Sequence, residues 1–278
     1  MFVLLSKPNI GMNEMTDQDK LGERFRVATE AIREAGAKGL DYFRNREGLQ
    51  ISSKGVQDTV SNADRELEAM IRSRLETAFP EDAFFGEESG RGEGDLENGI
   101  WVVDPIDGTD CFVHSIPVWC VSIAFLVGKD VEIGLIYDPN ADELFAARRG
   151  HGATVNGVPM KAAQATSFRD GLFSIGYSMR RPYRGTVDIL ERLLAEDAMF
   201  QRNGSGALAL AYVAAGRYIG YYEAHINSWD CLAAIGLIRE AGGWTNDFLA
   251  GDGLFSGNVI AACAPGLEDP MRKTCLLD

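Results

Sequence analysis

The chain has 278 residues, of which 46% are hydrophobic and 24% are charged, and these ordinary globular proportions exclude a disordered, collagen-like or disulfide-scaffold protein. Its 41 acidic residues outweigh 27 basic ones, and the resulting charge of -14 predicts no partnership with a nucleic-acid backbone. No apolar run approaches the roughly 20 residues of a membrane helix, so we expect no membrane partner. Five scattered cysteines without a CxxC pair favour a reducing cytoplasm, and three isolated histidines argue against zinc.

The first part of the chain predicts two helices. Apolar residues recur at three- and four-residue steps over residues 15–42, which indicates one long amphipathic helix, whereas residues 2–5 are expected to be a disordered or edge segment. A second helix is expected to begin at Ser61 and to be closed by Pro80. Its predicted inward face consists of Ala63, Leu67, Met70, Ile71, Leu75 and Ala78. Between the helices, residues 52–58 are expected to form a loop or a short hairpin.

Short apolar runs separated by turn residues then predict a sheet, largely antiparallel in its later part, with a hairpin turn at residues 128–130. The expected strands are residues 83–85, 100–103, 119–127, 131–137 and 143–147. After residue 150 strands and helices alternate: strands at 172–177 and 218–223, helices at 187–195, 205–215 and 229–241, with Gly242 and Gly243 ending the last helix. The pattern predicts a mixed α/β (α+β) fold. We expect two halves, residues 1–150 and 151–278, that pack closely around a shared cleft.

The acidic turn at residues 104–109 is the most informative segment. Pro105 cannot donate to a sheet ladder and pushes Asp104 out of the helical region, so we expect the strand before it to end at residue 103. Asp104 and Asp107 then flank a tight turn, and both carboxylates can point into one pocket together with the carbonyl of Ile106. Two carboxylates about 4 Å apart repel by roughly 4 kcal/mol at an effective dielectric constant near 20, which a cation would relieve. A plain surface turn would use the same residue types.

Other groups near this turn suit the same chemistry. The backbone N–H groups of Gly108 and Thr109 are expected at the start of a helical turn, which is a ready anion site. Two further groups supply acids, namely Glu87 and Glu88 after a short apolar strand and Asp230 at a helix start. Each could be an ordinary solvated or helix-start acid. Taken together the acids predict an oxygen-rich cage, and Mg²⁺ prefers a few carboxylates with water and phosphate.

Three ordered groups of residues together resemble the inositol monophosphatase family: Glu87-Glu88, residues 101–112 followed by residues 117–123, and Trp229-Asp230 followed by residues 240–243. The resemblance extends from the first helix to about residue 265. It implies a layered α-β-α-β-α sandwich that hydrolyses small phosphate monoesters with two or three Mg²⁺ ions. It also implies a homodimer and inhibition by lithium.

The resemblance carries roles to individual residues. Glu87, Asp104 and the Ile106 carbonyl match ligands of a first metal ion. Asp104, Asp107 and Asp230 match those of a second ion. Asp64, whose plain interpretation is a helix-start residue, matches an acid near a weaker third ion. Thr109 and Glu87 would orient an attacking water that the metal activates, Glu88 would support them, and the N–H groups of Gly108 and Thr109 would hold phosphate oxygens.

The substrate alcohol is expected to contact Gly204, Ser205, Gly206 and Glu223, which match family positions, although Ser205 would also suit a helix N-cap. Glu223 favours a polyol or an amino alcohol, because its carboxylate would otherwise be left unpaired. Two residues depart from the family pattern: Cys111 replaces the usual asparagine and Ile219 replaces a frequent acid. These departures weaken an assignment to myo-inositol phosphate specifically.

Alternative interpretations remain open at this stage. Inositol 1-phosphate is the first expected substrate, and its rivals are histidinol phosphate, fructose 1,6-bisphosphate and 3'-phosphoadenosine 5'-phosphate. Arg180, Arg181 and Arg184 form a solvated surface or a partner contact, unless one of them reaches a second anionic group of the substrate. A regulatory scaffold without catalysis and a calcium-binding module are the minor alternatives from other classes.

Overall fold

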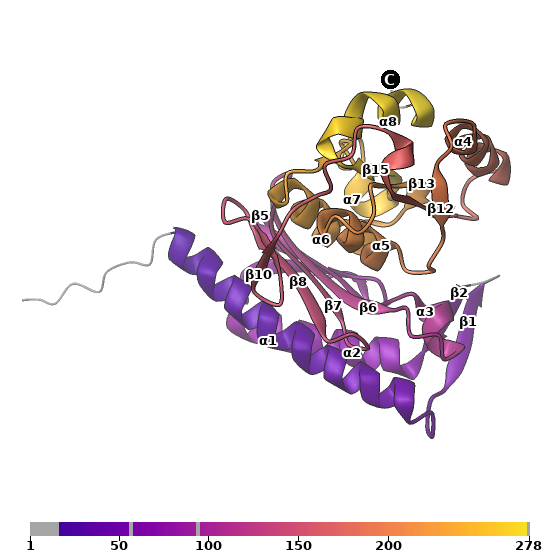
Figure 1. Cartoon of the computed structure of the whole chain (residues 1–278). Coiled ribbons are helices and arrows are strands. Elements are labelled where there is room, and N and C mark those ends of the chain that lie inside the picture. Colours follow the sequence, from indigo (N-terminus) through magenta and orange to yellow (C-terminus); the bar gives the residue numbers. More distant parts are fainter. Residues whose placement is uncertain (1–16, 56–57, 93–94, 277–278) are drawn as a thin grey trace, which may run out of the picture.

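The computed structural model describes residues 17–55, 58–92 and 95–276, and the predicted N-terminal segment at residues 2–5 lies outside them. The described chain forms five layers, seen edge-on in Figure 1: an outer helix pair, a large sheet, a central helix pair, a smaller sheet and a second outer helix layer. This arrangement confirms the predicted mixed α/β class and the α-β-α-β-α sandwich. No helix among the described residues combines the length and the apolar character needed to cross a bilayer.

The large sheet contains eight strands in the order β10-β9-β8-β7-β6-β5-β3-β4. Their bounds are β3 Asp82–Gly86, β4 Gly90–Arg91, β5 Asp95–Asp107, β6 Cys120–Val127, β7 Asp130–Asp138, β8 Glu143–Arg148, β9 Ala153–Val155 and β10 Val158–Met160. Only β3 and β5 pair in parallel, and the pairings from β5 to β10 are all antiparallel, as predicted for the later part. The proposed boundary near residue 150 falls between β8 and β9, inside this sheet, and the division into halves stays a prediction.

Strand β5 corrects one expectation, because it does not end at Val103. Its pairing with β6 continues from Asp104 opposite Ser122 to Asp107 opposite Cys120, with the register shifted between the two pairs. Pro105 therefore lies within a bulge, where the ladder needs no N–H from it. The bulge places Asp104 and Asp107 at the end of one buried strand, and both side chains are almost fully buried.

The first outer layer consists of α1 (Asp17–Arg44) and α2 (Asn62–Ala78), which cover one face of the large sheet. The predicted hairpin between them exists as β1 (Ile51–Gly55) paired antiparallel with β2 (Asp58–Ser61). Most of the expected inward face of α2 is buried. The expectation was wrong for Met70, which is only half-buried, and for Ala78, which is exposed in the last turn of the helix.

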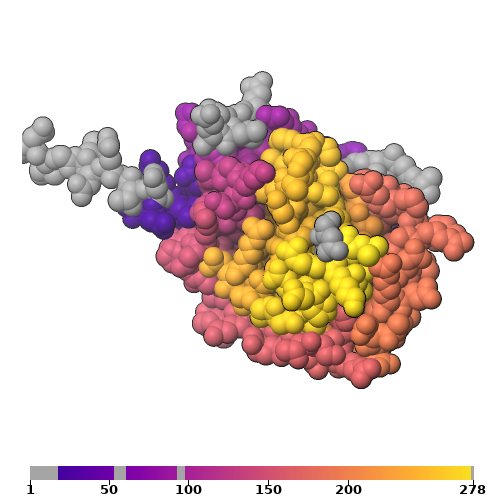
Figure 2. All heavy atoms as spheres, turned by 90° about the horizontal axis from the view of Figure 1, so that it is seen from above, coloured from indigo at the N-terminus to yellow at the C-terminus, as the bar shows by residue number. Residues whose placement is uncertain are grey.

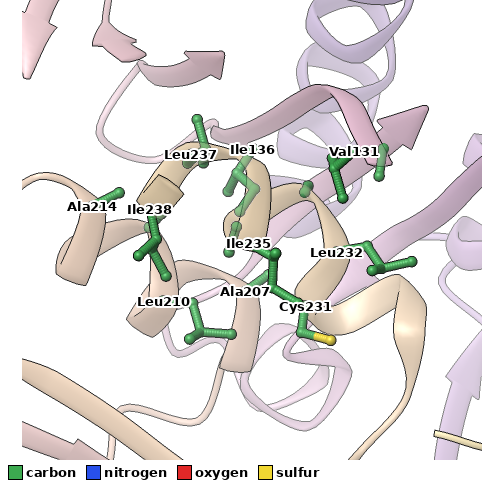
Figure 3. Packing of buried hydrophobic residues seen from close by; sticks show 14 of the residues in the cluster. Val131, Ile136, Ala207, Leu210, Ala214, Cys231, Leu232, Ile235, Leu237 and Ile238 are labelled. Carbon is green, nitrogen blue, oxygen red and sulfur yellow. The ribbon is translucent and has the colours of Figure 1, made fainter. Parts of the chain in front are cut away.

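The central layer consists of α5 (Gly206–Ala214) and α6 (Ser228–Glu240), which lie between the two sheets (Figure 1). Figure 3 shows their apolar side chains packed with those of β7. Small residues allow this packing: a Cβ on Gly134 of β7 would lie 2.2 Å from the carbonyl oxygen of Ala233. Both helices begin at the same place, beside the bulge of β5, because Asp107 accepts a hydrogen bond from the Ala207 N–H of α5 and clusters with Asp230 of α6.

The smaller sheet has the strand order β12-β11-β13-β15-β14. Its bounds are β11 Leu172–Ile175, β12 Met199–Gln201, β13 Gly220–Ile226, β14 Trp244–Thr245 and β15 Asn258–Cys263. The predicted strand at 172–177 ends early, and the one at 218–223 is shifted toward the C-terminus, to Gly220–Ile226. The pattern did not predict β12, β14 and β15; the alanines of β15 are poor strand formers whose burial decides their conformation.

The last layer contains α4 (Tyr183–Ala195) and α8 (Glu268–Cys275), which pack on the smaller sheet. Short helices complete the connections: α3 (Thr109–Val113), α7 (Gly253–Ser256) and the 3-10 turns Phe168–Asp170 and Pro265–Leu267. Viewed from above in Figure 2, the yellow C-terminal segment occupies the middle of this outer face. All five cysteines are free and buried.

Candidate active site

Three carboxylates meet where β5 ends and α6 begins. One oxygen from each of Asp104, Asp107 and Asp230 lies within 4.8 Å of the others, although Asp230 is more than 120 residues away in sequence. Asp104 is 1% exposed and Asp107 is 8% exposed. Among the residues that the structure describes, no lysine or arginine forms an ion pair with any of the three.

Each carboxylate is oriented by a backbone N–H. Asp104 Oδ1 accepts a hydrogen bond from the N–H of Ile106 at 2.9 Å, within the bulge. Asp107 Oδ2 accepts from the N–H of Ala207 at 2.8 Å and from the hydroxyl of Ser205, so the start of α5 holds it. Asp230 Oδ2 accepts from the N–H of Asn227 at 3.2 Å as part of the capping box of α6. The carboxylates are thus held close together by local backbone geometry, against their mutual repulsion.

The pKa values reflect this conflict. Burial raises the pKa of Asp104 well above its ordinary value, and the charges of Glu87, Asp107 and Asp230 raise it further. Burial also raises the pKa of Asp107, while the hydrogen bonds from Ser205 and from the first turn of α5 lower it. The pKa of Asp230 is raised by burial and by the charge of Asp107. Negative charge here is therefore disfavoured unless a cation is bound.

The donor set fits a hard divalent cation. It offers only oxygen atoms, two of its three carboxylates are buried, and none of them has a cationic side chain to neutralise it within the described residues. Mg²⁺ selects such oxygen sites with few carboxylates, whereas zinc prefers nitrogen and sulfur. Cys120 Sγ lies 3.9 Å from Asp107 Oδ2, but burial and the charge of Asp107 raise the pKa of this thiol well above its ordinary value. Cys120 is therefore a neutral neighbour.

Helix α3 begins directly after the acidic turn. Gly108 is its N-cap with φ of +96°, and a Cβ there would lie 2.8 Å from the carbonyl oxygen of Val118, so only glycine fits. The hydroxyl of Thr109 lies 2.9 Å from the Ile106 carbonyl oxygen and 3.3 Å from Asp64 Oδ1. Asp64 is 1% exposed and belongs to the capping box of α2 with Ser61. The structure thus brings the predicted Asp64, Ile106 and Thr109 into contact.

The loop between β3 and β4 carries Glu87 and Glu88. The Glu87 N–H donates to the carbonyl of Val103 at 3.1 Å, which holds Glu87 beside the strand that leads to Asp104. Glu87 also lines the cavity described below. Glu88 does not line it; its carboxylate lies 3.9 Å from the guanidinium of Arg65 and raises the pKa of Asp64.

A cavity of about 500 Å³, the size of a small-molecule site, opens beside the acids. Its lining contains seven of the predicted site residues: Glu87, Asp107, Gly204, Ser205, Gly206, Glu223 and Asp230. Ser205 is the N-cap of α5, and its hydroxyl accepts from the Leu208 N–H at 3.2 Å while it donates to Asp107. The helix-cap interpretation and the cavity-lining position of Ser205 therefore hold together.

Glu223 lies on β13 and lines the same cavity as Asp107 and Asp230. It is 9% exposed, and the hydroxyl of Tyr221 donates to its Oε2 at 2.6 Å. Burial raises the pKa of Glu223 to about 7, and the charge of Asp107 adds to this rise, while the hydrogen bond from Tyr221 and the charges of Arg202 and Arg180 oppose it. Gly176 gives the carboxylate its room, since a Cβ there would lie 2.2 Å from Glu223 Oε2.

The three arginines Arg180, Arg181 and Arg184 differ in their positions relative to the cavity. Arg180 lines the cavity, whereas Arg181 and Arg184 do not, and both are exposed. Sequence reasoning missed Arg202 and Asn203, which also line the cavity. Their position directly before the predicted Gly204 could have suggested them.

The two departures from the family pattern have different surroundings. Cys111 lies against Asn203 and Gly204, two residues that line the cavity. A Cβ on Gly204 would lie 2.5 Å from the Cys111 sulfur, and this sulfur lies 3.8 Å from the Asn203 carbonyl oxygen. Ile219 is 3% exposed in the apolar cluster of the smaller sheet and does not line the cavity. Only Cys111 can affect the site directly.

Comparisons with known proteins agree with this geometry. The sequence pattern of the inositol monophosphatase family matches residues 20–272. The chain is 37% identical over 238 residues to the Nus factor SuhB of Escherichia coli, an alignment that covers 84% of this chain and 89% of that protein.

Solved structures extend the likeness to the fold. The extragenic suppressor protein suhB of Bartonella henselae superposes with a TM-score of 0.84 at 34% identity, covering 90% of this chain and 97% of the other. An inositol monophosphatase from Anabaena (Nostoc) superposes with a TM-score of 0.80 at 30% identity, covering 93% and 97%.

Proposed function

The chain belongs to the inositol monophosphatase family, and on that premise we propose that it is a Mg²⁺-dependent phosphomonoesterase whose first substrate is inositol 1-phosphate or a similar polyol phosphate. Family membership by itself supports a metal-dependent phosphatase. The observation that carries the proposal is the cluster of the buried Asp104 and Asp107 with the partly buried Asp230, uncompensated by any described cationic side chain and open to a small-molecule cavity.

We assign the metal ligands as the sequence suggested: Glu87, Asp104 and the Ile106 carbonyl for one ion, Asp104, Asp107 and Asp230 for a second, and Asp64 near a weaker third. Bound Mg²⁺ would act as a Lewis acid that offsets phosphate charge and lowers the pKa of water. The buried carboxylates support this assignment, since each has one oxygen held by a backbone N–H and therefore needs no reorganisation to bind.

Around phosphorus, the chain itself supplies orientation and proton transfer. Glu87 and the Thr109 hydroxyl orient the attacking water, and the Glu87 carboxylate takes its proton, with Glu88 in support. The N–H groups of Gly108 and Thr109 hold the phosphate oxygens at the start of α3, where backbone donors favour an anion. The position of Thr109 as the first residue of α3 supports this role.

The part of the cavity lined by Glu223 and residues 204–206 would receive the alcohol. Glu223 accepts hydrogen bonds from substrate hydroxyls, and residues 204–206 contact the alcohol from the start of α5. The position of Glu223 in the cavity lining supports a polar occupant, because Tyr221 occupies only Oε2 and a substrate hydroxyl would be a partner for the other oxygen.

Rival phosphate esters share the same acids. Fructose 1,6-bisphosphate and 3'-phosphoadenosine 5'-phosphate carry a second anionic group, and the lining arginines Arg180 and Arg202 offer two guanidinium groups without an ion pair among the described residues. Histidinol phosphate carries an ammonium group, which Glu223 could accept.

Phosphate release from these four esters tests the proposal, measured with Mg²⁺, with a chelator and with added Li⁺, and with Asp107→Asn as the blank. We expect Mg²⁺-dependent release that falls at least about 1,000-fold in the variant, since the amide keeps the bonds to α5 but removes the charge. Unchanged turnover in Asp107→Asn at saturating Mg²⁺ would remove this residue from the site. If the wild-type protein released phosphate from none of the four esters, the proposed phosphatase activity would be contradicted.

A second candidate follows from the name of the curated relatives, Nus factor SuhB. We carry it to this chain as a regulatory scaffold that uses the fold without hydrolysis. A folded protein that binds Mg²⁺ yet releases no phosphate would favour it.

Three finer properties complete the proposal: a homodimer, inhibition by Li⁺ and residence in the cytoplasm. The exposed apolar residues of α4 and edge strand β12, such as Val187 and Met199, support self-association. Five free cysteines support a reducing compartment. Light scattering and the Li⁺ titration test the first two.

A further inference from the structure

Helix α2 carries a second buried acid, Glu68, which none of the assignments above uses. It lies one helical turn after Asp64 on the same face, and it is 3% exposed. No lysine or arginine pairs with it in the described ranges. A buried carboxylate without a cation requires hydrogen bonds in compensation.

Two backbone N–H groups of the loop between β3 and β4, residues 87–89, provide those bonds. Glu68 Oε2 accepts from the N–H of Glu88 at 2.8 Å, and Oε1 accepts from the N–H of Ser89 at 2.8 Å. Both oxygens of the carboxylate are therefore used on consecutive residues of one loop, a fork that fixes the orientation of the loop as well as its distance.

The sequence leaves space for this contact at Gly86. A Cβ on Gly86 would lie 2.4 Å from Glu68 Cδ and 2.4 Å from Oε2. Any other residue at the end of β3 would displace the carboxylate. Glycine here is explained by the approach of Glu68.

The loop held in this way carries Glu87. Its own N–H is bonded to Val103 on one side, and Glu68 holds the next two residues on the other. Glu87 lies close enough to Asp104 to raise its pKa, and it lines the cavity. The position of the Glu87 side chain therefore depends on a clamp made by a different element.

We propose that Glu68 is a positioning residue, which sets Glu87 against Asp104 through the N–H groups of Glu88 and Ser89. The inference rests on the proposed function for its kinetic consequence. Helix α2 thus contacts both acidic segments: Asp64 contacts Thr109 after the turn at residues 104–109, and Glu68 holds the loop at residues 87–89.

Glu68→Gln tests the clamp with little change in shape. The amide has one acceptor oxygen, and its NH₂ group would face the other backbone N–H, so one of the two bonds is lost. We expect kcat to fall about tenfold with KM within about twofold, and the Mg²⁺ dissociation constant measured by calorimetry to rise about tenfold, the lower end of the range seen when outer-shell partners of metal ligands are removed. Amide hydrogen exchange in residues 84–92 should become faster.

Glu66→Gln is the matched control, because Glu66 is an exposed acid of the same helix whose partners, Lys38 and Tyr42, lie on α1 and not in the loop. It should leave kcat, Mg²⁺ affinity and exchange unchanged. Gly86→Ala should reproduce the effects of Glu68→Gln by displacing the carboxylate, and the double variant should lose little more than either single one, since both break one contact. If Glu68→Gln does not fold, Gly86→Ala and Glu68→Asp carry the same test.

A folded Glu68→Gln protein with wild-type kcat and wild-type Mg²⁺ affinity would overturn the proposal, as would a loss of thermal stability alone. The two proposals fail separately. A wild-type protein that releases no phosphate contradicts the phosphatase, while Mg²⁺ affinity and hydrogen exchange still report whether Glu68 sets the loop.

Discussion

The cavity has two walls that are built in opposite ways. The acid wall is formed by the buried Asp104 and Asp107 and the partly buried Asp230, and each carboxylate accepts a hydrogen bond from a backbone N–H. The arginine wall, formed by residues 176–180 with Arg202 and Glu223, contains exposed side chains at Tyr177, Met179 and Arg180. In the described structure the guanidinium groups of Arg180 and Arg202 have no ion pair.

This difference separates chemistry from selectivity. The acid wall is fixed by the bulge of β5 and the starts of α5 and α6, so it can change only if several elements move together. Residues 176–180 of the arginine wall form a loop after the short strand β11, where substitutions cost little stability, whereas Glu223 lies on β13. We infer that the fold determines how a phosphate ester is cleaved and that the loop determines which ester enters.

The largest effect should come from Asp104→Asn, which removes one charge from the acid wall and keeps the bond from the Ile106 N–H. Activity should fall at least about 1,000-fold. Without divalent cations, however, the variant should be more stable than the wild type by about 1 kcal/mol or more, because burial and three neighbouring acids disfavour the Asp104 charge. Urea unfolding with a chelator measures this, and a variant less stable than the wild type would show that repulsion does not govern this wall.

A smaller effect is expected from Glu223→Gln in the arginine wall. Burial raises the pKa of Glu223 from 4.5 to about 7, so the folded state favours the protonated form. Its contribution to stability is fully present below pH 4.5 and is lost as pH rises to about 7. The free energy of unfolding should therefore fall by on the order of 3 kcal/mol more in the wild type than in the variant between these pH values.

The kinetic counterpart of Glu223→Gln is a KM for inositol 1-phosphate raised about tenfold with kcat nearly unchanged, since the interaction is with the alcohol. Equal pH profiles of unfolding for the two proteins would contradict the buried, protonated carboxyl. An unchanged KM would remove Glu223 from alcohol recognition.

The smallest effect should come from Arg180→Ala, with Arg181→Ala as its control from the same exposed loop. Arg180 lines the cavity, so its loss should raise KM about threefold for a monophosphate and more for fructose 1,6-bisphosphate, in proportion to ligand charge. Steady-state kinetics at two salt concentrations separate the variants. Equal KM values for Arg180→Ala and Arg181→Ala would mean that Arg180 does not recognise the negative charge of the substrate.

Sequence patterns predicted the acid wall better than its opposite. Asp104 and Asp107 are three residues apart around a proline, and that spacing indicates a shared pocket without knowledge of the fold. Two features of the same wall were not predictable locally: the bulge that carries Pro105 inside the strand depends on pairing with β6, and Glu68 meets residues 20 positions away.

The arginine wall depends still more on tertiary structure. Arg180 and Arg181 are adjacent and chemically alike, yet only one lines the cavity, and nothing in their local pattern separates them. Arg202, from a different segment of the chain, lines the cavity together with Arg180. Helix α2 shows the same effect, because Met70 fits the apolar period of the helix but is only half-buried.

The central helix pair has a consequence for how the protein is made. One face of the large sheet, built from residues 82–160, is covered by α5 and α6, which end only at Glu240. During synthesis at roughly 5–20 residues per second, that apolar face stays open for several seconds after its last strand has emerged. Translation therefore passes through a stage in which a nearly complete sheet is exposed on the ribosome, and a chain that stops at residue 150 would present side chains such as Ile136 and Phe145 to any chaperone or neighbouring nascent chain.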